Sequence, residues 1–403
     1  PLGVISVLTF TTPDFSYSGK VIYAAVTYTL LLLLYAGSNL PYSALSGVIT
    51  GDMKERNSIS AYRFVAVMFA QFFVQVFMLP IIKYAGDGNK ADGIEVTMTW
   101  LAIIGTILLL ITFFTTRERI IPKPEQSSSL MEDLKDLIKN KPWLIMLSVT
   151  ILLFTTLALK GGAYVYYFEN YISYFSLEEF INPTLAFLSA IGINFFGSDP
   201  VSAGFGLFNA GGILFMIIGI GISKKLADEY GKRNVFGIFL FISTLFIAIF
   251  YFLSPDLIGL IFLAQIFHGF FYGVTIPLLW AMIADVADYS EWKNNRRATA
   301  IIFSAMMVGL KLGLTFGQTI IPIFLENYGY ITEQFGKNLF ILNGTYIRTY
   351  IDQPESAISA TKSLVSILPS IPFLISVGLL FFYIIDKNLE DKIEKDLLNR
   401  RKD

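Results

Sequence analysis

Long apolar segments follow one another along almost the whole chain. Seven of them contain no Asp, Glu, Lys or Arg, and two more are interrupted only by a single lysine, Lys160 or Lys311. About 20 apolar residues let a helix cross a bilayer, whereas the strands of a membrane barrel alternate apolar and polar positions. The pattern therefore predicts nine full transmembrane helices. They cover residues 21–50, 64–82, 96–116, 143–168, 201–222, 234–253, 257–284, 298–325 and 363–385.

The first residues of the chain are apolar as well, but they are too few to cross a membrane. Leu2–Phe10 follow Pro1 rather than an initiating Met, and they lack the positively charged start of a signal peptide. We expect them to be the second half of a helix, and the chain to be truncated at its N-terminus.

Composition supports a polytopic membrane protein and excludes several kinds of site. Of the 403 residues 54% are hydrophobic and only 15% are charged, where a soluble domain has roughly 25% charged residues. The net charge of −1 argues against nucleic-acid binding. The chain has no cysteine and one histidine, His268, which argues against thiolate metal sites and a Ser-His-Asp triad. We expect neither an enzyme nor a cofactor.

Basic residues give the orientation, because Lys and Arg concentrate on the cytoplasmic side of membrane proteins. Of the 30 Lys and Arg, 22 lie on alternate loops and in the C-terminal tail. That side is expected to be cytoplasmic, with the C-terminus there, in the plasma membrane (the inner membrane of a bacterium).

A short internal repeat suggests two related halves with the same side facing inward. Three residues recur 236 positions later: Pro41, Asp52 and Glu55 at Pro277, Asp288 and Glu291. Acids at the cytoplasmic end of one half, paired with bases of the other, could close the inner entrance of a transporter; the alternative is ordinary solvated loop charge. The candidate cytoplasmic gate comprises Asp52, Glu55, Arg56, Asp285, Asp288, Glu291, Arg296 and Arg297.

The expected architecture is two helical bundles joined by a basic linker. Within the linker, 130–138 has the apolar spacing of an amphipathic surface helix, although a plain tether is the alternative. Six helices follow the linker, so the N-terminal bundle should also have six, of which part is missing. The domains are 1–116 (the end of helix 3 and helices 4–6), 117–142 (linker), 143–385 (helices 7–12) and 386–403 (cytoplasmic tail).

Two lysines inside predicted spans are candidates for function. A lysine near mid-bilayer costs at least about 2.5–3.5 kcal/mol on insertion scales, so Lys311 should face a cavity or an ion-pair partner. We expect it to contact substrate and to take part in coupling. Lys160 lies beside Gly161-Gly162 and could contact substrate or snorkel to the membrane surface.

Uncharged candidates have structural alternatives too. Asn39 precedes the helix-kinking Pro41 and suits hydrogen bonding to hydroxyl groups, or to a neighbouring helix. Aromatic side chains could stack on a sugar ring, but many serve as core or lipid-facing residues. Those considered are Tyr42, Tyr164, Tyr167 and Trp280. His268 fits a buried neutral histidine better than a proton carrier.

Several stretches resemble the glycoside–pentoside–hexuronide:cation symporters, the melibiose-permease-like branch of the major facilitator superfamily. The matching stretches are Asn39–Leu45 with Asp52–Arg56 and Arg63, Lys160–Phe168, Asp228–Arg233, Ala284–Lys293 with Arg296-Arg297, and Phe303-Ser304 through Lys311–Gly313. The resemblance implies an all-α major facilitator fold, twelve helices in the intact protein, and alternating-access symport of a sugar with Na⁺ or H⁺. It also implies a role for Arg63 in sugar binding and for Lys311 in coupling.

The chain departs from that family's pattern at two positions. Asn39 stands where the family has a cation-site aspartate, which places Asn39 at the coupling site, and Ile276 stands where a sugar-binding tryptophan is known. Expected partners are a sugar or glycoside, a coupling cation and the lipid bilayer, with the protein a monomer. The alternative is a carrier of the same fold for an anionic or non-sugar solute, such as a hexuronide or a lipid-like molecule.

Overall fold

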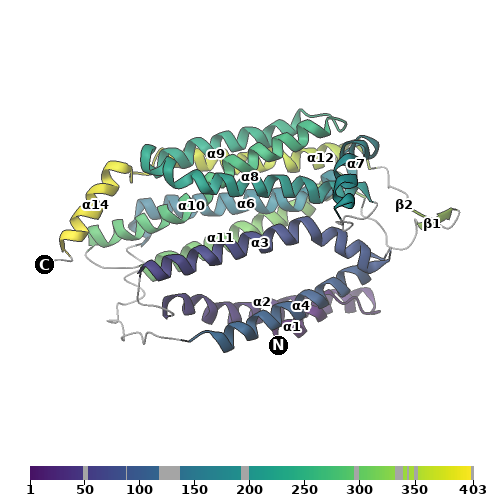
Figure 1. The fold of residues 1–403 in the computed structure, drawn as a ribbon, viewed down its shortest axis with the longest axis horizontal. Coiled ribbons are helices and arrows are strands. Elements are labelled where there is room, and N and C mark those ends of the chain that lie inside the picture. Colours follow the sequence, from purple (N-terminus) through teal and green to yellow (C-terminus); the bar gives the residue numbers. More distant parts are fainter. Residues whose placement is uncertain are drawn as a thin grey trace. The chain divides into compact units, whose positions relative to one another are not determined.

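A computed structural model describes most of the chain as two helical units (Figure 1). The first unit comprises Pro1–Ser127 with Leu188–Gly206, and the second comprises Ser128–Phe187 with Leu207–Asp403. Each unit is considered by itself. The residues described are 1–48, 53–87, 89–117, 137–191, 199–294, 299–331, 339–342, 345–348 and 353–400.

Four helices form the first unit: α1 (Leu2–Phe10), α2 (Tyr17–Val48), α3 (Met53–Gly86) and α4 (Lys90–Thr115). Helix α4 packs against both α1 and α3, and α1 packs against α2. Between α3 and α4 the backbones are in close contact, because a Cβ on Gly93 would lie 2.0 Å from the carbonyl oxygen of Ile82. Helix α3 bends by 44° between Ala66–Val74 and Val76–Gly86. Pro80 accounts for the bend, since its ring clashes with the carbonyl four residues earlier.

An ion pair holds the segment Leu188–Gly206 to the first unit. Lys83, at the end of α3, pairs with Asp199, which precedes the next long helix. Ser202 donates hydrogen bonds from its backbone N and its Oγ to Asp199 Oδ2, at 2.8 and 2.6 Å. Burial alone would raise the pKa of the Asp199 carboxyl, but Lys83 and Ser202 together hold that pKa below its ordinary value. Asp199 therefore acts as a charged N-cap.

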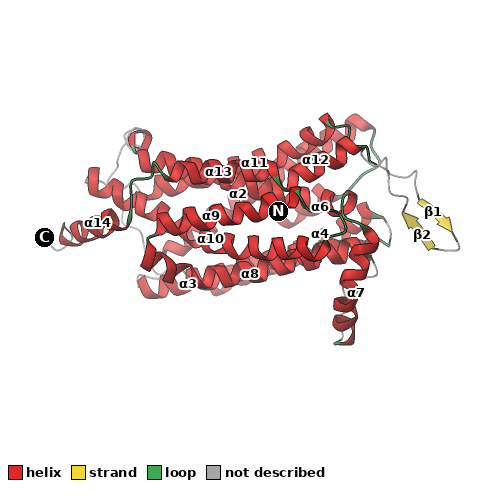
Figure 2. Ribbon diagram, turned by 90° about the horizontal axis from the view of Figure 1, so that it is seen from above, coloured by secondary structure: helices red, strands yellow, loops and turns green. Residues whose placement is uncertain are grey.

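The second unit is built around α6 (Lys141–Asn170), which packs against α10, α11, α12 and α13. Figure 2 shows its helices in red, with one small pair of strands in yellow. The other elements, in chain order, are α7 (Tyr174–Ala190), α8 (Pro200–Tyr230), α9 (Lys232–Ala248), η1 (Ile249–Tyr251), α10 (Ile258–Asn294), α11 (Thr299–Asn327), β1 (Leu339–Leu342), β2 (Thr345–Arg348), α12 (Glu355–Val365), α13 (Ile367–Leu380) and α14 (Lys387–Arg400).

The membrane-spanning helices agree with the apolar segments of the sequence. Within the described residues, eight helices are long and apolar enough to cross a bilayer, and nine if the bent α3 is counted as one span. Helices α12 and α13 together form one of them, Glu355–Leu380. Helix α1 has nine residues and does not reach the required length. The prediction of an all-α membrane protein is confirmed.

The principal contact of the second unit, between α6 and α11, depends on glycines spaced by four residues. Gly309, Gly313 and Gly317 line the side of α11 that faces α6. A Cβ on Gly313 would lie 2.4 Å from the Ile151 carbonyl oxygen, so the two backbones touch. Small residues at this spacing give membrane helices their closest approach, where packing replaces the hydrophobic effect as the force of association.

A hairpin within residues 339–348 was not predicted. Strands β1 and β2 pair antiparallel, with Leu342 opposite Thr345. Asn343-Gly344 stands between them in the sequence, and this dipeptide favours the tight type I′ turn of a two-residue hairpin. The signal for this hairpin was therefore present in the sequence, in a stretch too short and too mixed in character to be a membrane span.

The C-terminal tail is a helix that packs on the second bundle (Figure 1). The apolar side of α14 buries Ile393 and Leu397. Trp292 Nε1 on α10 donates a hydrogen bond to Asp396 Oδ2, at 2.9 Å. Most of the predicted linker helix 130–138 lies outside the described residues; of its last two residues, Leu137 is buried and Ile138 is exposed.

Replacing Gly313 by alanine should weaken the α6–α11 contact. The added methyl group would collide with backbone of α6, and overpacking of this kind costs about 1–3 kcal/mol of the free energy of unfolding. The matched control is Gly378→Ala in α13, where a Cβ would meet nothing within 4 Å. Thermal unfolding in detergent should show a lower Tm for Gly313→Ala and no loss for Gly378→Ala. Equal Tm values for the two variants would contradict the packing described.

Candidate functional site

Three helices of the second unit meet at a buried lysine and a buried histidine. Lys160 of α6 is 9% exposed and donates a hydrogen bond to Nε2 of His268 on α10, which is 1% exposed. On the other side of the ring, His268 Nδ1 lies 3.2 Å from the carbonyl oxygen of Ser243 and 2.8 Å from its Oγ, on α9. The predicted burial of His268 is confirmed. The two residues were considered separately in the sequence, and the fold joins them.

One turn along α6, Tyr164 takes part in a second buried contact. Its hydroxyl donates to Oε1 of Gln265 on α10 at 3.0 Å, and its ring packs edge-on against Phe208 at 4.9 Å between centroids. Only 2% of Tyr164 is exposed. Helix α8 can lie close to Gln265 because Gly212, which has no side chain, faces the Gln265 amide. In this structure the Tyr164 ring is therefore surrounded by core side chains.

Tyrosines continue along the same side of α6 toward its C-terminal end. Tyr167 is fully buried, and its hydroxyl makes no hydrogen bond within the described part of the chain. Its ring stacks on that of Tyr171 at 5.0 Å, and Tyr171 donates to the Leu253 carbonyl at 2.6 Å. An unpaired buried hydroxyl lowers the free energy of unfolding by about 1–3 kcal/mol, so the Tyr167 hydroxyl does not stabilise the fold.

Lys311 has a different setting from Lys160. It is exposed, and within the described residues its amino group makes no hydrogen bond or ion pair. Two residues turn an α-helix by about 200°, so Lys311 lies on the side of α11 opposite Gly309 and Gly313. Thr315 and Gln318 are exposed on that same side. The α11 polar face, comprising Lys311, Thr315 and Gln318, thus interrupts an otherwise apolar membrane surface.

The remaining substrate candidates are placed less completely. In the first unit, Asn39 of α2 is half-buried and Tyr42 is 42% exposed, and their spacing of three puts them on one side of the helix. Arg63 belongs to α3, with its side chain outside the described residues. Trp280 of α10 is half-buried in the second unit. That these residues line one cavity with Lys160 and Lys311 stays a prediction.

One member of the predicted gate has its partner within its own bundle. Lys232, at the start of α9, bonds both carboxylate oxygens of Asp285 at 2.7 and 2.8 Å and Glu390 of α14 at 2.7 Å. This three-residue cluster was missed in the sequence. No local pattern gave a signal for it, because its members lie on α9, α10 and α14, far apart in the sequence.

The pairing of the gate across the two halves stays a prediction. Asp288 and Glu291 are half-buried on α10, and both have further interactions. Asp52, Arg296 and Arg297 lie outside the described residues, as do the side chains of Glu55 and Arg56.

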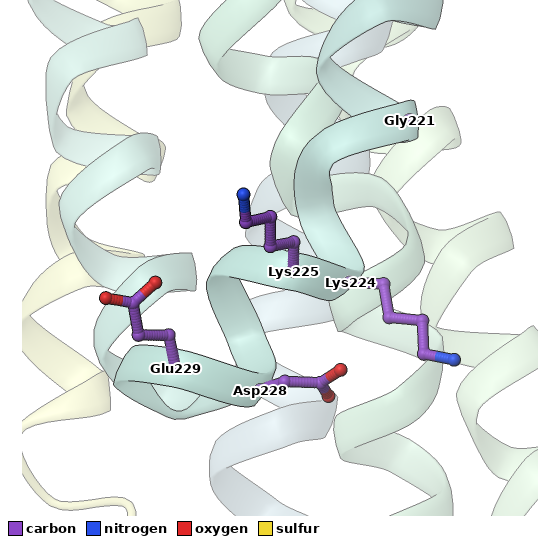
Figure 3. A pocket seen from close by; sticks show the side chains of 5 residues that line it. All are labelled: Gly221, Lys224, Lys225, Asp228 and Glu229. Atoms are coloured by element: carbon purple, nitrogen blue, oxygen red, sulfur yellow. The ribbon is translucent and has the colours of Figure 1, made fainter.

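A shallow hollow of about 550 Å³ lies at the end of α8, beside the stretch Asp228–Arg233 (Figure 3). Lys225 and Glu229 extend to one side of the helix, and Lys224 and Asp228 to the other. Each pair has the spacing of four at which opposite charges on a helix attract. The charges balance and face open space, so the hollow is typical of a solvated helix end. In the described residues no group of three or more His, Cys, Asp or Glu could hold a metal ion.

Comparison with known proteins agrees with the membrane architecture. The model of the MFS/sugar transport protein family matches residues 1–199 and 198–387. The inner membrane symporter YicJ of Escherichia coli (strain K12) is 30% identical over 100% of this chain and 78% of its own length. The isoprimeverose transporter of Lactiplantibacillus pentosus is 25% identical over 98% of this chain and 74% of its own length.

Among solved structures, a mutant of the nucleoside transporter NupG superposes with a TM-score of 0.50 at 15% sequence identity. The match covers 95% of this chain and 82% of that one, and it supports the transporter fold alone. The matching family model spans both units, and the relatives are symporters or sugar transporters along nearly the whole chain. The chain is therefore a multi-pass membrane protein that belongs to the MFS/sugar transport protein family.

Proposed function

We propose that the protein is a secondary transporter that moves a sugar or glycoside across a bacterial inner membrane by symport with H⁺ or Na⁺. The α11 polar face is the observation that carries this proposal. A lysine turned toward lipid would cost at least about 2.5–3.5 kcal/mol, so Lys311 requires a polar surrounding such as a water-filled cavity. Gln318 beside it offers a donor and an acceptor that suit sugar hydroxyls, and Thr315, whose hydroxyl donates to the Lys311 carbonyl at 2.9 Å, offers an acceptor.

Binding is assigned to groups that hydrogen-bond or stack on a sugar ring. Lys311, Asn39 and Arg63 supply polar contacts, and Tyr42 and Trp280 supply aromatic faces. In such a site a few well-placed polar groups in a mostly apolar pocket fix the orientation of the ligand and provide specificity. Lys160 and Tyr164 have their polar atoms bonded inside the second bundle, so they act from behind the surface that meets substrate.

Alternating access is assigned to the two bundles moving against each other around one site, as in transporters built from repeated halves. The candidate gate supplies the charge pairs that form and separate at the cytoplasmic side. Lys232 keeps Asp285 within its own bundle, so Asp288 and Glu291 are the acids assigned to contacts with bases of the first half. The coupling role proposed for Lys311 and Asn39 rests on the family resemblance, in which their positions belong to coupling and to the cation site.

A second candidate is transport of an anionic solute of the same size, such as a hexuronide. The observation in its favour is that Lys311 has no acidic partner within the described residues. A substrate carboxylate would neutralise its charge and form a charge-assisted hydrogen bond, which is roughly twice as strong as a neutral one.

Uptake into sealed vesicles tests both candidates. The protein, as its gene encodes it, would be reconstituted and offered labelled glycosides, pentosides and hexuronides under an H⁺ gradient, a Na⁺ gradient or neither. We expect one gradient to drive accumulation of one class of sugar. Accumulation of hexuronides alone would favour the anionic candidate. Folded protein that accumulates none of them under any gradient would contradict the proposal.

Removing the charge of Lys311 tests whether this residue takes part in coupling. Lys311→Ala should abolish concentrative uptake, because the cavity loses its fixed cation, while exchange of labelled for unlabelled sugar survives with a raised KM. Lys311→Arg keeps the charge and serves as the control. Both would be measured as initial rates and steady-state accumulation in the same vesicles. Unchanged accumulation by Lys311→Ala would exclude a part for this residue in coupling.

A further inference from the structure

The Lys160–His268 contact is unusual because both partners can bind a proton and neither faces a carboxylate. Among the described residues that are buried, these two alone carry basic side-chain nitrogens. Their helices are 108 residues apart in sequence and meet inside the bundle. A buried charge without a counter-ion is costly in a membrane, so the number of protons held here matters.

We assign the ring proton of His268 to Nδ1, because that nitrogen faces the Ser243 carbonyl oxygen at 3.2 Å and a carbonyl oxygen can only accept. The Ser243 hydroxyl, 2.8 Å from the same nitrogen, then donates to the His268 carbonyl oxygen at 3.3 Å. Nε2 then presents its lone pair, and Lys160 donates to that lone pair. An ammonium and a neutral amine can both make this bond. A second proton on Nε2 would remove the acceptor and set two positive charges in contact.

The pair therefore alternates between two states that differ by one proton. With the proton bound, Lys160 is an ammonium and the pair carries one positive charge; after release to water, Lys160 is an amine and the pair is neutral. The bond to His268 remains in both states. Lys160 is 9% exposed next to the exposed Gly161, so the bundle shields the pair without enclosing it completely.

Surrounding elements supply few groups that could compete for this proton. Tyr164 lies below the Lys160 amino group at 5.5 Å from its ring centroid, and Tyr272 stacks on the His268 ring at 5.8 Å. Helix α13 contains no charged residue. The other charges of the packed helices lie elsewhere: Lys141 at the start and Glu169 near the end of α6, Lys224, Lys225, Asp228 and Glu229 at the end of α8, Lys232 and Arg233 at the start of α9, Asp285, Asp288, Glu291 and Lys293 at the end of α10, Lys311 and Glu326 of α11, and Glu355 and Lys362 of α12.

We propose that the Lys160–His268 pair binds the coupling proton of the transporter. The inference rests on the proposed function and selects H⁺ over Na⁺, because a site made of two nitrogens that holds one positive charge repels a sodium ion, which prefers oxygen ligands. Substrate meets the α11 polar face, and α6, which carries Lys160, packs directly on α11 through its glycines. Through this contact, substrate binding at α11 can shift α6 and with it the proton site.

Three tyrosines follow Lys160 toward the end of α6 that the sequence predicts to be outside. Tyr164, Tyr167 and the C-cap Tyr171 stand at spacings of four, three and four, which covers about 16 Å of helix. Their hydroxyls are not bonded to one another: Tyr164 donates to Gln265, Tyr171 donates to the Leu253 carbonyl, and the buried Tyr167 hydroxyl has no hydrogen-bond partner within the described residues.

Proton movement with and without a driving gradient tests the proposal. In Lys160→Met the ionisable nitrogen is gone, so substrate should no longer carry protons inward, as read by a pH-sensitive dye in the vesicles. Accumulation under an H⁺ gradient should fall to the equilibrium level, while substrate counterflow, which needs no net proton movement, keeps its KM. Thr156→Val is the control, since it removes a buried 2.9 Å bond to the Pro369 carbonyl from the same helix.

The outcomes distinguish the proposal from the function on which it rests. Wild-type protein without any sugar counterflow would contradict the proposed function. Uphill accumulation of sugar driven by a Na⁺ gradient would overturn the proton site alone. Proton uptake that persists in folded Lys160→Met would do the same. If Lys160→Met does not fold, His268→Gln keeps a side-chain donor and acceptor without an ionisable ring and should shift the pH dependence of uptake; an unchanged profile would overturn the proposal.

A direct measurement is available because the chain has a single histidine. The ¹⁵N NMR spectrum of histidine-labelled wild-type protein in lipid should show a neutral ring with the proton on Nδ1 and an Nε2 that accepts a bond. In Lys160→Met the Nε2 resonance should move to that of an acceptor without a donor. A wild-type ring with its proton on Nε2 would overturn the assignment, whether or not transport is observed.

Discussion

Every polar group inside a bilayer must find its partner within the protein, and this constraint governs the second bundle. Lys160, His268 and Ser243 satisfy one another across α6, α10 and α9, and Tyr164 and Gln265 repeat the arrangement one turn away. The surrounding lipid offers no hydrogen bonds to replace these. The helices are consequently held in one register by a few directional contacts, while glycines and apolar side chains fill the rest of the interface.

Sequence patterns predicted the membrane fold because its main determinant is local. The length of an apolar run alone decides whether it can span a bilayer. The effects of Pro80 and Gly313 on their helices likewise follow from residue type, without knowledge of which helix packs beside them. The hairpin at Leu339–Arg348 was also readable, through Asn343-Gly344, and was missed only because the surrounding stretch is short and mixed in character.

The site was only partly predictable, and the reason is long-range pairing. Lys160 and His268 each stand out in charge-free helices, yet nothing local indicates that α6 and α10 place them in contact. The same holds for Asp285, whose sequence position suggested a partner in the other half, whereas the fold pairs it with Lys232, which also pairs with Glu390. Sequence identifies which side chains are costly in a membrane; only the packing of helices identifies what offsets that cost.

The cluster at Lys232 has a consequence for how the tail behaves. Glu390 and Asp285 share one amino group, Asp396 holds Trp292, and Lys387 donates to the Asp228 carbonyl at 2.5 Å. These bonds come from α8, α9 and α10 and converge on α14. The C-terminal helix is thus a rigid extension of its bundle, so a spectroscopic label fixed to α14 would follow the movement of the whole bundle during turnover.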